Sequence, residues 1–142
     1  MLRPTIDLPS SFHFTAEIPL RITDMNYSNH LGNDSLLAVM QEARVQMLAL
    51  HGWGELDIEG KGTIMADCVV LFKSEGFYGD VIVADIAVTE LESRSFTLLY
   101  RLTNKKTGKE VARARTGMIF FDYENRKPIT MPKEFADSFS QR

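Results

Sequence analysis

Hydrophobic and polar residues alternate in two different ways along the chain. Between residues 33 and 50 the apolar side chains recur every three or four positions, which predicts one amphipathic helix. Its apolar stripe consists of Leu36, Val39, Met40, Ala43, Met47 and Leu50. The helix is expected to stop at His51-Gly52, because glycine readily adopts the left-handed conformation that ends helices. From residue 63 to residue 122 the period is two, which is typical of strands with one buried face.

Four strands are predicted in the second half of the chain, over residues 63–74, 80–90, 95–103 and 110–122. The links between them are short, so we expect a meander of antiparallel neighbours. A first strand is predicted before the helix over residues 12–23, where Pro19 indicates a sheet edge or a bulge. Residues 132–139 are predicted to form a short terminal helix. One helix with an apolar stripe and one curved antiparallel sheet can bury each other's faces, which predicts an α+β fold.

The most polar stretch of the chain leads directly into the predicted helix. Between Asp24 and Ser35 it contains Asn26, Tyr27, Ser28, Asn29, His30, Gly32, Asn33 and Asp34. These residue types are ordinary in turns and helix caps, so a simple turn is one interpretation. A helix start also exposes unpaired backbone N–H groups, which suit an oxygen that acquires negative charge. His30 would add an imidazole, a group that changes charge close to neutral pH.

This stretch resembles the signature of hotdog-fold acyl thioesterases, a superfamily that includes 4-hydroxybenzoyl-CoA thioesterases and small bacterial acyl-CoA thioesterases. The resemblance rests on Asp24, Asn26, the run His30-Leu31-Gly32-Asn33 and the helix residues Glu42-Ala43-Arg44, with smaller echoes at Tyr78-Gly79-Asp80 and Arg126-Lys127-Pro128. It implies a hotdog fold, in which a curved antiparallel sheet of about five strands wraps one long central helix. It also implies hydrolysis of an acyl-CoA or acyl-carrier thioester by a homo-oligomer, a dimer or a tetramer, with the site between subunits.

The sequence departs from the family pattern at positions that bear on the chemistry. Asn26 stands where these enzymes commonly carry a catalytic aspartate, and Gly32 replaces the first asparagine of a pair. An amide cannot act as a general base, so the resemblance leaves His30 and Glu42 as the candidates that activate water, with Asn26 positioning it. The alternative is a hotdog domain that binds an acyl thioester or a protein partner with little or no turnover.

Substrate-binding groups are expected at the junction of the polar run with the helix. The resemblance implies that Tyr27, Gly32 and Asn33 contact the substrate or stabilise the oxyanion through backbone N–H groups. Asp24 is expected to fix the loop by accepting backbone N–H groups. Phosphates of coenzyme A would need cations, and the candidates are Arg94, Arg101, Lys105, Lys106, Arg113 and Arg115, although ordinary solvation of the strands explains them equally well.

Composition narrows the function class further. A length of 142 residues fits a single domain over residues 1–142, and a net charge of −3 argues against nucleic acid as a partner. No apolar run approaches the roughly 20 residues that span a bilayer, so no membrane partner is expected. No secretory h-region is visible near Met1, and the cytoplasm is the expected location.

Cys68 is the only cysteine, which excludes an internal disulfide and a multi-cysteine metal site. No metal and no cofactor are expected. Strand alternation places Cys68 on the same face as Ile64, Val70 and Phe72, and we interpret it as a small buried hydrophobe. The long strand over residues 110–122 is expected to offer an exposed edge for pairing between subunits.

Overall fold

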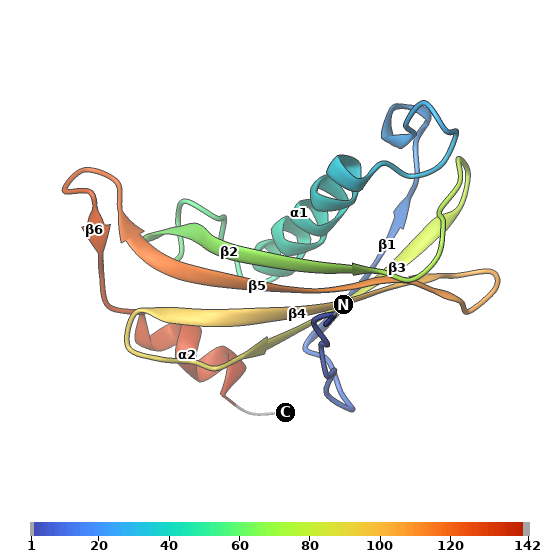
Figure 1. The fold of residues 1–142 in the computed structure, drawn as a ribbon. Helices are drawn as coiled ribbons and strands as arrows, with labels where there is room; N and C mark the ends of the chain where they lie inside the picture. The colour runs from blue at the N-terminus through green and yellow to red at the C-terminus, as the bar shows by residue number, and fades with distance from the viewer. Residues whose placement is uncertain (1, 141–142) are drawn as a thin grey trace.

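The computed structural model describes residues 2–140 as one curved sheet with a long helix on one face (Figure 1). The elements are β1 (Phe14–Pro19), the short 3-10 helix η1 (Ile22–Asp24), α1 (Asn33–Ala49), β2 (Gly62–Phe72), β3 (Val81–Thr89), β4 (Ser95–Asn104), β5 (Glu110–Asp122), β6 (Lys127–Pro128) and α2 (Lys133–Phe139). The predicted α+β fold is confirmed, including the long helix, the four later strands and the short terminal helix. The first strand is shorter than predicted and ends at Pro19. In the described part of the chain no helix combines the length and apolarity needed to cross a membrane.

The strand order in the sheet is β1-β3-β4-β5-β2, and every neighbouring pair is antiparallel. The short strand β6 pairs with the end of β5. The predicted meander is therefore wrong for β2, which pairs with β5 and not with β3. Residues 73–80 form a connection longer than a tight hairpin turn. It crosses three interstrand spacings, about 14 Å, to reach β3. The edge position predicted for the strand with Pro19 is confirmed.

The free edges of the sheet are β1 and β2. The predicted exposed edge at the long strand is wrong, because β5 lies between β4 and β2. With 13 residues, β5 is long enough to pair with β2 on one side and with both β4 and β6 on the other. The long unpaired edge belongs to β2, which has 11 residues.

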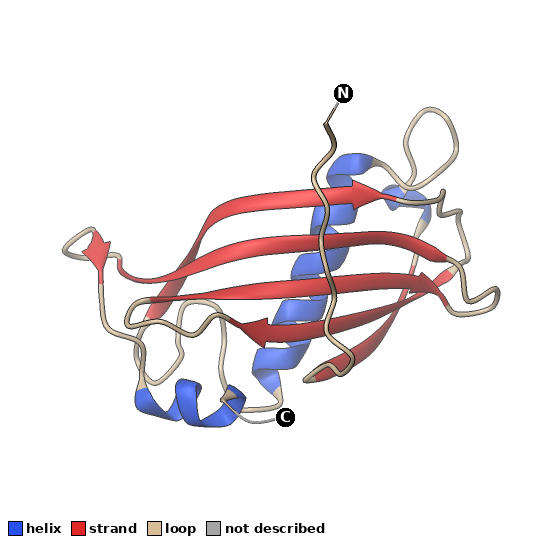
Figure 2. Ribbon diagram, turned by 60° about the horizontal axis from the view of Figure 1, so that its bottom comes forward, coloured by secondary structure: helices blue, strands red, loops and turns tan. Residues whose placement is uncertain are grey.

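The helix α1 packs its apolar stripe on one face of the sheet, while the N-terminal segment crosses the opposite face (Figure 2). Leu36, Met40, Ala43 and Met47 are at most 2% exposed, which confirms this part of the predicted stripe. The prediction is wrong for Leu50, which caps the end of the helix and is 75% exposed. Burying one such large apolar side chain contributes about 1.5–3 kcal/mol. The helix ends at Ala49, and the turn that follows it closes at Gly52, whose φ of 76° is left-handed, as predicted.

One buried charge joins the helix to the sheet and to the following loop. Arg44 is 7% exposed, and its Nε donates to Glu55 Oε1 at 2.8 Å. Its Nη1 donates to the Tyr100 hydroxyl at 3.2 Å, and this hydroxyl also bonds with Thr116 Oγ1 at 2.8 Å. Burial raises the pKa of the Tyr100 phenol, so the group stays neutral at physiological pH. The network fixes the position of α1 on β4 and β5.

The prediction of a buried Cys68 is wrong, because the thiol is exposed. A register shift between Met65 and Asp67 inserts an extra residue into β2, and the bulge breaks the simple alternation of faces. In addition, β2 has no neighbour beyond its free edge in this chain. The alternating sequence of β2 therefore predicts a buried face that the bulge and the edge position leave partly exposed.

Candidate functional site

Backbone hydrogen bonds give the polar run between η1 and α1 one compact shape. The Asn26 N–H donates to the His30 carbonyl at 2.9 Å, and the Asn29 N–H donates to the Asn26 carbonyl at 3.0 Å. Asn29 has a φ of 64°, a left-handed conformation that asparagine tolerates better than most residues. Asn26 Oδ1 accepts the Ser28 N–H at 2.9 Å. The turn interpretation is thus correct for Asn26, Ser28 and Asn29.

Two further bonds attach this loop to its neighbours. The Leu31 N–H donates to the Gly76 carbonyl at 2.7 Å, which ties the loop to the connection after β2. The Gly32 N–H donates to the Asp24 carbonyl at 3.0 Å. The buried Asp24 carboxylate accepts the Arg21 N–H at 2.8 Å and pairs with the Arg21 guanidinium at 3.3 Å. Asp24 therefore orders the loop, as predicted, and does not reach the cavity described below.

The start of α1 faces the loop with unused backbone donors. The first backbone bond of the helix runs from the Leu36 N–H to the Gly32 carbonyl at 3.0 Å, so the N–H groups of Asn33, Asp34 and Ser35 precede the helical ladder. A Cβ atom on Gly32 would lie 2.7 Å from Asp34 Oδ1 and 3.5 Å from Asn26 Cβ. Glycine leaves room here for the Asp34 carboxylate, which would have to shift if a Cβ atom were added.

A cavity of about 860 Å³ opens where the loop, the helix start and the end of β2 meet. Asn26, Tyr27, His30 and Asn33 line it from the loop and the helix, so the structure brings four of the six predicted site residues together. Gly32 lies between them as the N-terminal cap of α1. The opposite wall is formed by residues 72–76.

His30 has the chemistry of a base in this cavity. Its Nδ1 lies 3.2 Å from the Leu31 carbonyl oxygen. Because a carbonyl oxygen only accepts, Nδ1 must carry the hydrogen, and this leaves the lone pair on Nε2. The His30 side chain is half-buried. Tyr27, by contrast, is 98% exposed and borders the cavity from the tip of the loop.

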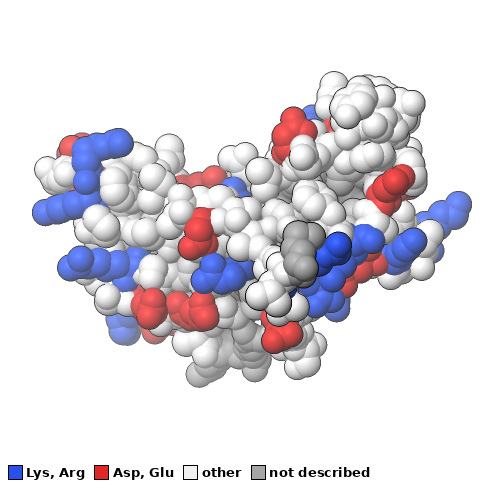
Figure 3. Space-filling view, in the orientation of Figure 1, with Lys and Arg blue, Asp and Glu red and all other residues white. Residues whose placement is uncertain are grey.

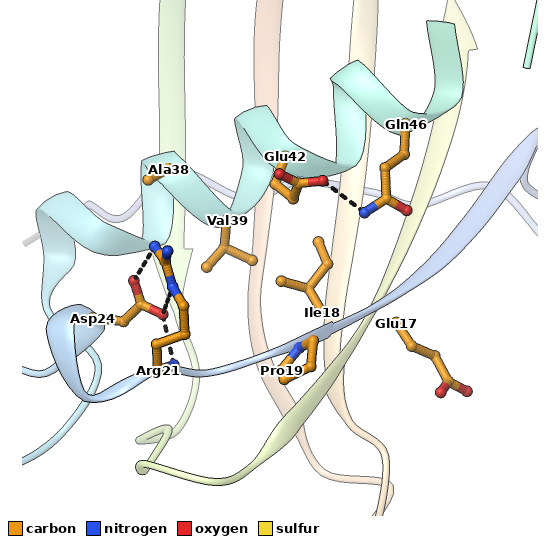
Figure 4. A pocket seen from close by; sticks show the side chains of 9 residues that line it. All are labelled: Glu17, Ile18, Pro19, Arg21, Asp24, Ala38, Val39, Glu42 and Gln46. Carbon is orange, nitrogen blue, oxygen red and sulfur yellow. Dashed lines mark hydrogen bonds and ion pairs between the residues drawn. The ribbon is translucent and has the colours of Figure 1, made fainter. Parts of the chain in front are cut away.

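Glu42 lies elsewhere. It lines a second cavity of about 300 Å³ between α1 and β1, together with Arg21 and Asp24 (Figure 4). Its carboxylate accepts a hydrogen bond from Gln46 Nε2 at 2.7 Å. Within one protomer, Glu42 and His30 therefore face different cavities, and this separation could not be read from their spacing in the sequence.

Two carboxylates in the first cavity were not singled out from the sequence. Asp34 was visible inside the polar run, and its position in the first turn of the helix was a usable signal. Glu75 lies beyond β2, far from the polar run in the sequence, and only the fold brings it to the cavity. Among residues 2–140, no group of three or more His, Cys, Asp or Glu side chains could hold a metal ion.

Residues 20–139 match the thioesterase-like superfamily, which covers most of the chain. No curated protein matches the sequence. Among solved structures, a 1,4-dihydroxy-2-naphthoyl-CoA thioesterase from Synechocystis, Slr0204, superposes with a TM-score of 0.82 at 17% identity, covering 90% of this chain and 96% of that one. The PA2801 protein from Pseudomonas aeruginosa gives 0.82 at 18% identity, covering 90% and 98%.

A plant protein shows the same fold within a longer chain. The 12:0-ACP thioesterase from Umbellularia californica gives a TM-score of 0.75 at 14% identity, covering 89% of this chain and 49% of that one. At these identities the comparisons establish the hotdog fold and not a substrate.

Proposed function

We propose that this chain, which belongs to the thioesterase-like superfamily, hydrolyses an acyl thioester in the cavity beside the start of α1. One observation carries the proposal. A single loop delivers His30, Asn26 and the unused N–H groups of the helix start to the same cavity. Thioester hydrolysis needs a base for water on one side of the carbonyl and hydrogen-bond donors for the oxyanion on the other.

In the proposed reaction, His30 Nε2 removes a proton from water as the oxygen attacks the thioester carbonyl. The oxyanion is stabilised by the backbone N–H groups of Asn33 and Asp34, where the helix dipole adds favourable partial charge. When the carbon–sulfur bond breaks, the imidazolium returns its proton to the departing thiolate. The products are a free acid and a thiol.

Asn26 and Gly32 support this reaction without transferring protons. Asn26 Oδ1 accepts the Ser28 N–H, and in the proposed reaction its Nδ2 donates to water or to the carbonyl. The Gly32 N–H is already bonded to Asp24, so we assign Gly32 a steric role and not an oxyanion donor. The base is His30 in preference to Glu42, because Glu42 faces the other cavity.

We further propose that the active form is a homodimer paired along β2. Of the two sheet edges, β1 has 6 residues and ends at Pro19, whereas β2 has 11 residues with no proline. Ile64 and Met65 on this edge are each 37% exposed. A long apolar edge invites pairing with another strand, and a two-fold axis would cover it. A tetramer would require a further interface.

The test is thiol release from a panel of short, long and aromatic acyl-CoAs. We expect His30→Ala to lower kcat/KM by about 100-fold or more, the usual contribution of a general base. Glu42→Gln is the matched control and should leave kcat/KM within about twofold. Unchanged turnover in His30→Ala would remove His30 from the mechanism. A large loss in Glu42→Gln would assign the base to the second cavity.

The second candidate function is binding of an acyl thioester without turnover. Asn26 favours it, because an amide replaces the expected carboxylate. Asn26→Asp separates the two functions, since an aspartate oxygen can still accept the Ser28 N–H and preserve the turn. A negligible rate in the natural sequence that rises strongly in Asn26→Asp would favour the binding function. A substantial rate that changes little would favour the enzyme.

A further inference from the structure

The first turn of α1 carries a carboxylate to which the proposed reaction assigns no role. Asp34 lines the cavity beside the start of α1, which we call the active-site cavity, together with Asn26 and His30. Its Oδ1 lies 2.7 Å from the point where a Cβ atom would stand on Gly32, and Asn26 Cβ lies 3.5 Å from the same point. The Asp34 side chain therefore folds back over Gly32 and approaches the Asn26 side chain.

The helix dipole is the ordinary explanation for an acidic residue in this position, because the first turn of a helix favours negative charge. A second explanation is capping, in which a side-chain oxygen accepts a backbone N–H of the helix start. The structure does not support capping, since the N-cap residue is Gly32 and no side chain caps the helix. Within residues 2–140, Asp34 makes no hydrogen bond and no ion pair. The dipole alone does not require the carboxylate to lie against Gly32, so this position needs a further explanation.

The surroundings of Asp34 hold few cations. The lobe that carries the polar loop shows little Lys or Arg surface in Figure 3, where most of these side chains lie along the sheet. Among the described residues, Lys73 is the one Lys or Arg that lines the active-site cavity, and it belongs to the opposite wall. The Asp34 residue is exposed, so its carboxylate oxygens are available to water or to a ligand.

The proposed reaction leaves one hydrogen of the attacking water without an acceptor. A water molecule has two O–H donors and two lone pairs, and one lone pair must attack the carbonyl carbon. When Asn26 Nδ2 donates to the other lone pair and His30 Nε2 accepts one O–H, the second O–H is not yet held. A misplacement of about 1 Å can cost about 100-fold in rate. A complete site therefore needs one more hydrogen-bond acceptor for the water.

Two carboxylates line the active-site cavity, and their positions decide between them. Glu75 belongs to the opposite wall and also lines the neighbouring polar hollow of about 510 Å³ with Lys73. Asp34 lies on the same side as Asn26, because both approach the missing Cβ of Gly32. In the described structure these two side chains make no direct hydrogen bond to each other. Hydrogen bonds to water measure about 2.8 Å, so one water molecule can bond to both Asn26 Nδ2 and an Asp34 oxygen.

We propose that Asp34 is a further catalytic residue, whose carboxylate accepts the second O–H of the attacking water and so directs the free lone pair at the thioester carbonyl. The inference rests on the proposed function. His30 still takes the proton that leaves the water and later returns it to the thiolate. The O–H that Asp34 holds stays on the oxygen and becomes the hydroxyl group of the product acid, so Asp34 transfers no proton.

This role gives three residues one common explanation. The Asn26 amide supplies the hydrogen-bond donor that a carboxylate lacks. Asp34 supplies the acceptor, and Gly32 leaves the room in which the two side chains approach. The two departures from the family pattern, Asn26 and Gly32, then form one arrangement with Asp34, in which the carboxylate acts from the helix and not from the loop.

The first test is Asp34→Asn, which keeps the shape of the side chain and removes its charge. We expect kcat for thiol release to fall about 100-fold, with KM within about threefold. Loss of the favourable charge on the helix dipole should lower Tm by no more than about 3 °C. A kcat within about threefold of the wild type would overturn the proposal. So would a loss of activity that is matched by a large fall in Tm, because it would identify a structural role.

The controls separate the cavity from the helix dipole. Glu134 is the acidic residue in the first turn of α2 and lies outside the active-site cavity, so Glu134→Gln should leave kcat within about twofold. Glu75→Gln removes the carboxylate of the opposite wall and should cost much less than Asp34→Asn. A larger loss in Glu75→Gln than in Asp34→Asn would place the acceptor on the opposite wall and overturn the proposal.

The second test moves the carboxylate across Gly32. In the double variant Asn26→Asp/Asp34→Asn the amide and the carboxylate exchange places, and the new carboxylate can still accept the Ser28 N–H. We expect kcat to rise about tenfold or more above that of Asp34→Asn, a recovery that a merely structural Asp34 would not produce. No gain over Asp34→Asn, with Tm within about 3 °C of the wild type, would overturn the proposal.

A double variant with His30 separates this inference from the proposed function. Because Asp34 and His30 act on the same water molecule, His30→Ala/Asp34→Asn should be only slightly slower than His30→Ala, whereas multiplied losses would overturn the proposal. If the wild type releases no thiol from any acyl-CoA, the proposed function itself fails. If the wild type turns over, His30→Ala is inactive and Asp34→Asn keeps full activity, the proposed function stands and only the role of Asp34 fails.

Discussion

The buried Arg44 network gives the sharpest test of how α1 is held on the sheet. We expect Arg44→Met to keep the volume of the side chain while removing its bond to Glu55 at 2.8 Å and its bond to Tyr100 at 3.2 Å. Tyr100 retains Thr116 as a partner at 2.8 Å, so no phenol is orphaned. Glu55 loses its cation, although its side chain is 23% exposed and water can replace part of the bond.

The magnitude follows from these contacts. A hydrogen bond to a charged group contributes about 1.5–3 kcal/mol, and the gain from no longer burying the guanidinium offsets part of the second bond, so we expect a loss of about 2–3 kcal/mol. With an unfolding entropy near 2.1 cal/mol/K per residue, about 0.3 kcal/mol/K for this length, Tm should fall by roughly 7–10 °C.

The assay is thermal unfolding at a fixed protein concentration, because the proposed association of protomers would make Tm depend on concentration. Lys133→Met is the control. Its pair with Asp137 is exposed, at 88% and 64% for the two side chains, and should shift Tm by no more than about 2 °C. In the double variant Arg44→Met/Glu55→Gln part of the loss should return, because no unpaired carboxylate remains. A Tm for Arg44→Met within about 1 °C of the wild type would refute the reasoning.

Three further predictions follow from other parts of the fold. Gly32→Ala should lower kcat/KM about tenfold or more while stability falls by only about 1 kcal/mol, since the new Cβ would meet Asp34 Oδ1 at 2.7 Å; parallel kinetics and denaturant unfolding check this. Phe135→Ala should cost about 3–5 kcal/mol in the free energy of unfolding, because the ring is fully buried; a loss under about 1 kcal/mol would contradict this packing. Hydrogen bonds from Arg113 lower the pKa of Glu110. This carboxylate therefore stabilises the fold above the pKa of an unfolded glutamate, about 4.3, and the contribution is lost as pH falls through the lower folded pKa. Denaturant unfolding of wild type and Glu110→Gln should differ at pH 7 and converge near pH 3.

Much of the fold was predictable because its signals are local. The apolar stripe at helical spacing marked α1 within one residue of its observed end, and Gly52 marked its stop. The strand over residues 110–122 was predicted with its observed bounds. Hydrophobic period and turn residues depend only on neighbours in the chain, so a single sequence carries them.

The pairing of strands and the burial of β2 were not predictable in the same way. A hydrophobic period of two indicates that a strand has one buried face, but it does not indicate which strand is its neighbour in the sheet. A connection of the length of residues 73–80 would also allow β3 to pair with β2. Whether β2 pairs with β3 or with β5 depends on packing across the whole sheet. The bulge near Met65 then exposed Cys68, which simple alternation had placed inside.

For the candidate site, the sequence by itself determined the loop. The turn residues, the imidazole and the start of the helix all lie within about ten residues, and local hydrogen bonds fix the shape of such a segment. Only the tertiary structure decided which groups share a cavity. It brought Glu75, beyond the end of β2, to the cavity that His30 lines, and it placed Glu42 in the cavity between α1 and β1. Contacts between residues far apart in the chain depend on how the sheet and helix bury each other, and no local pattern contains that information.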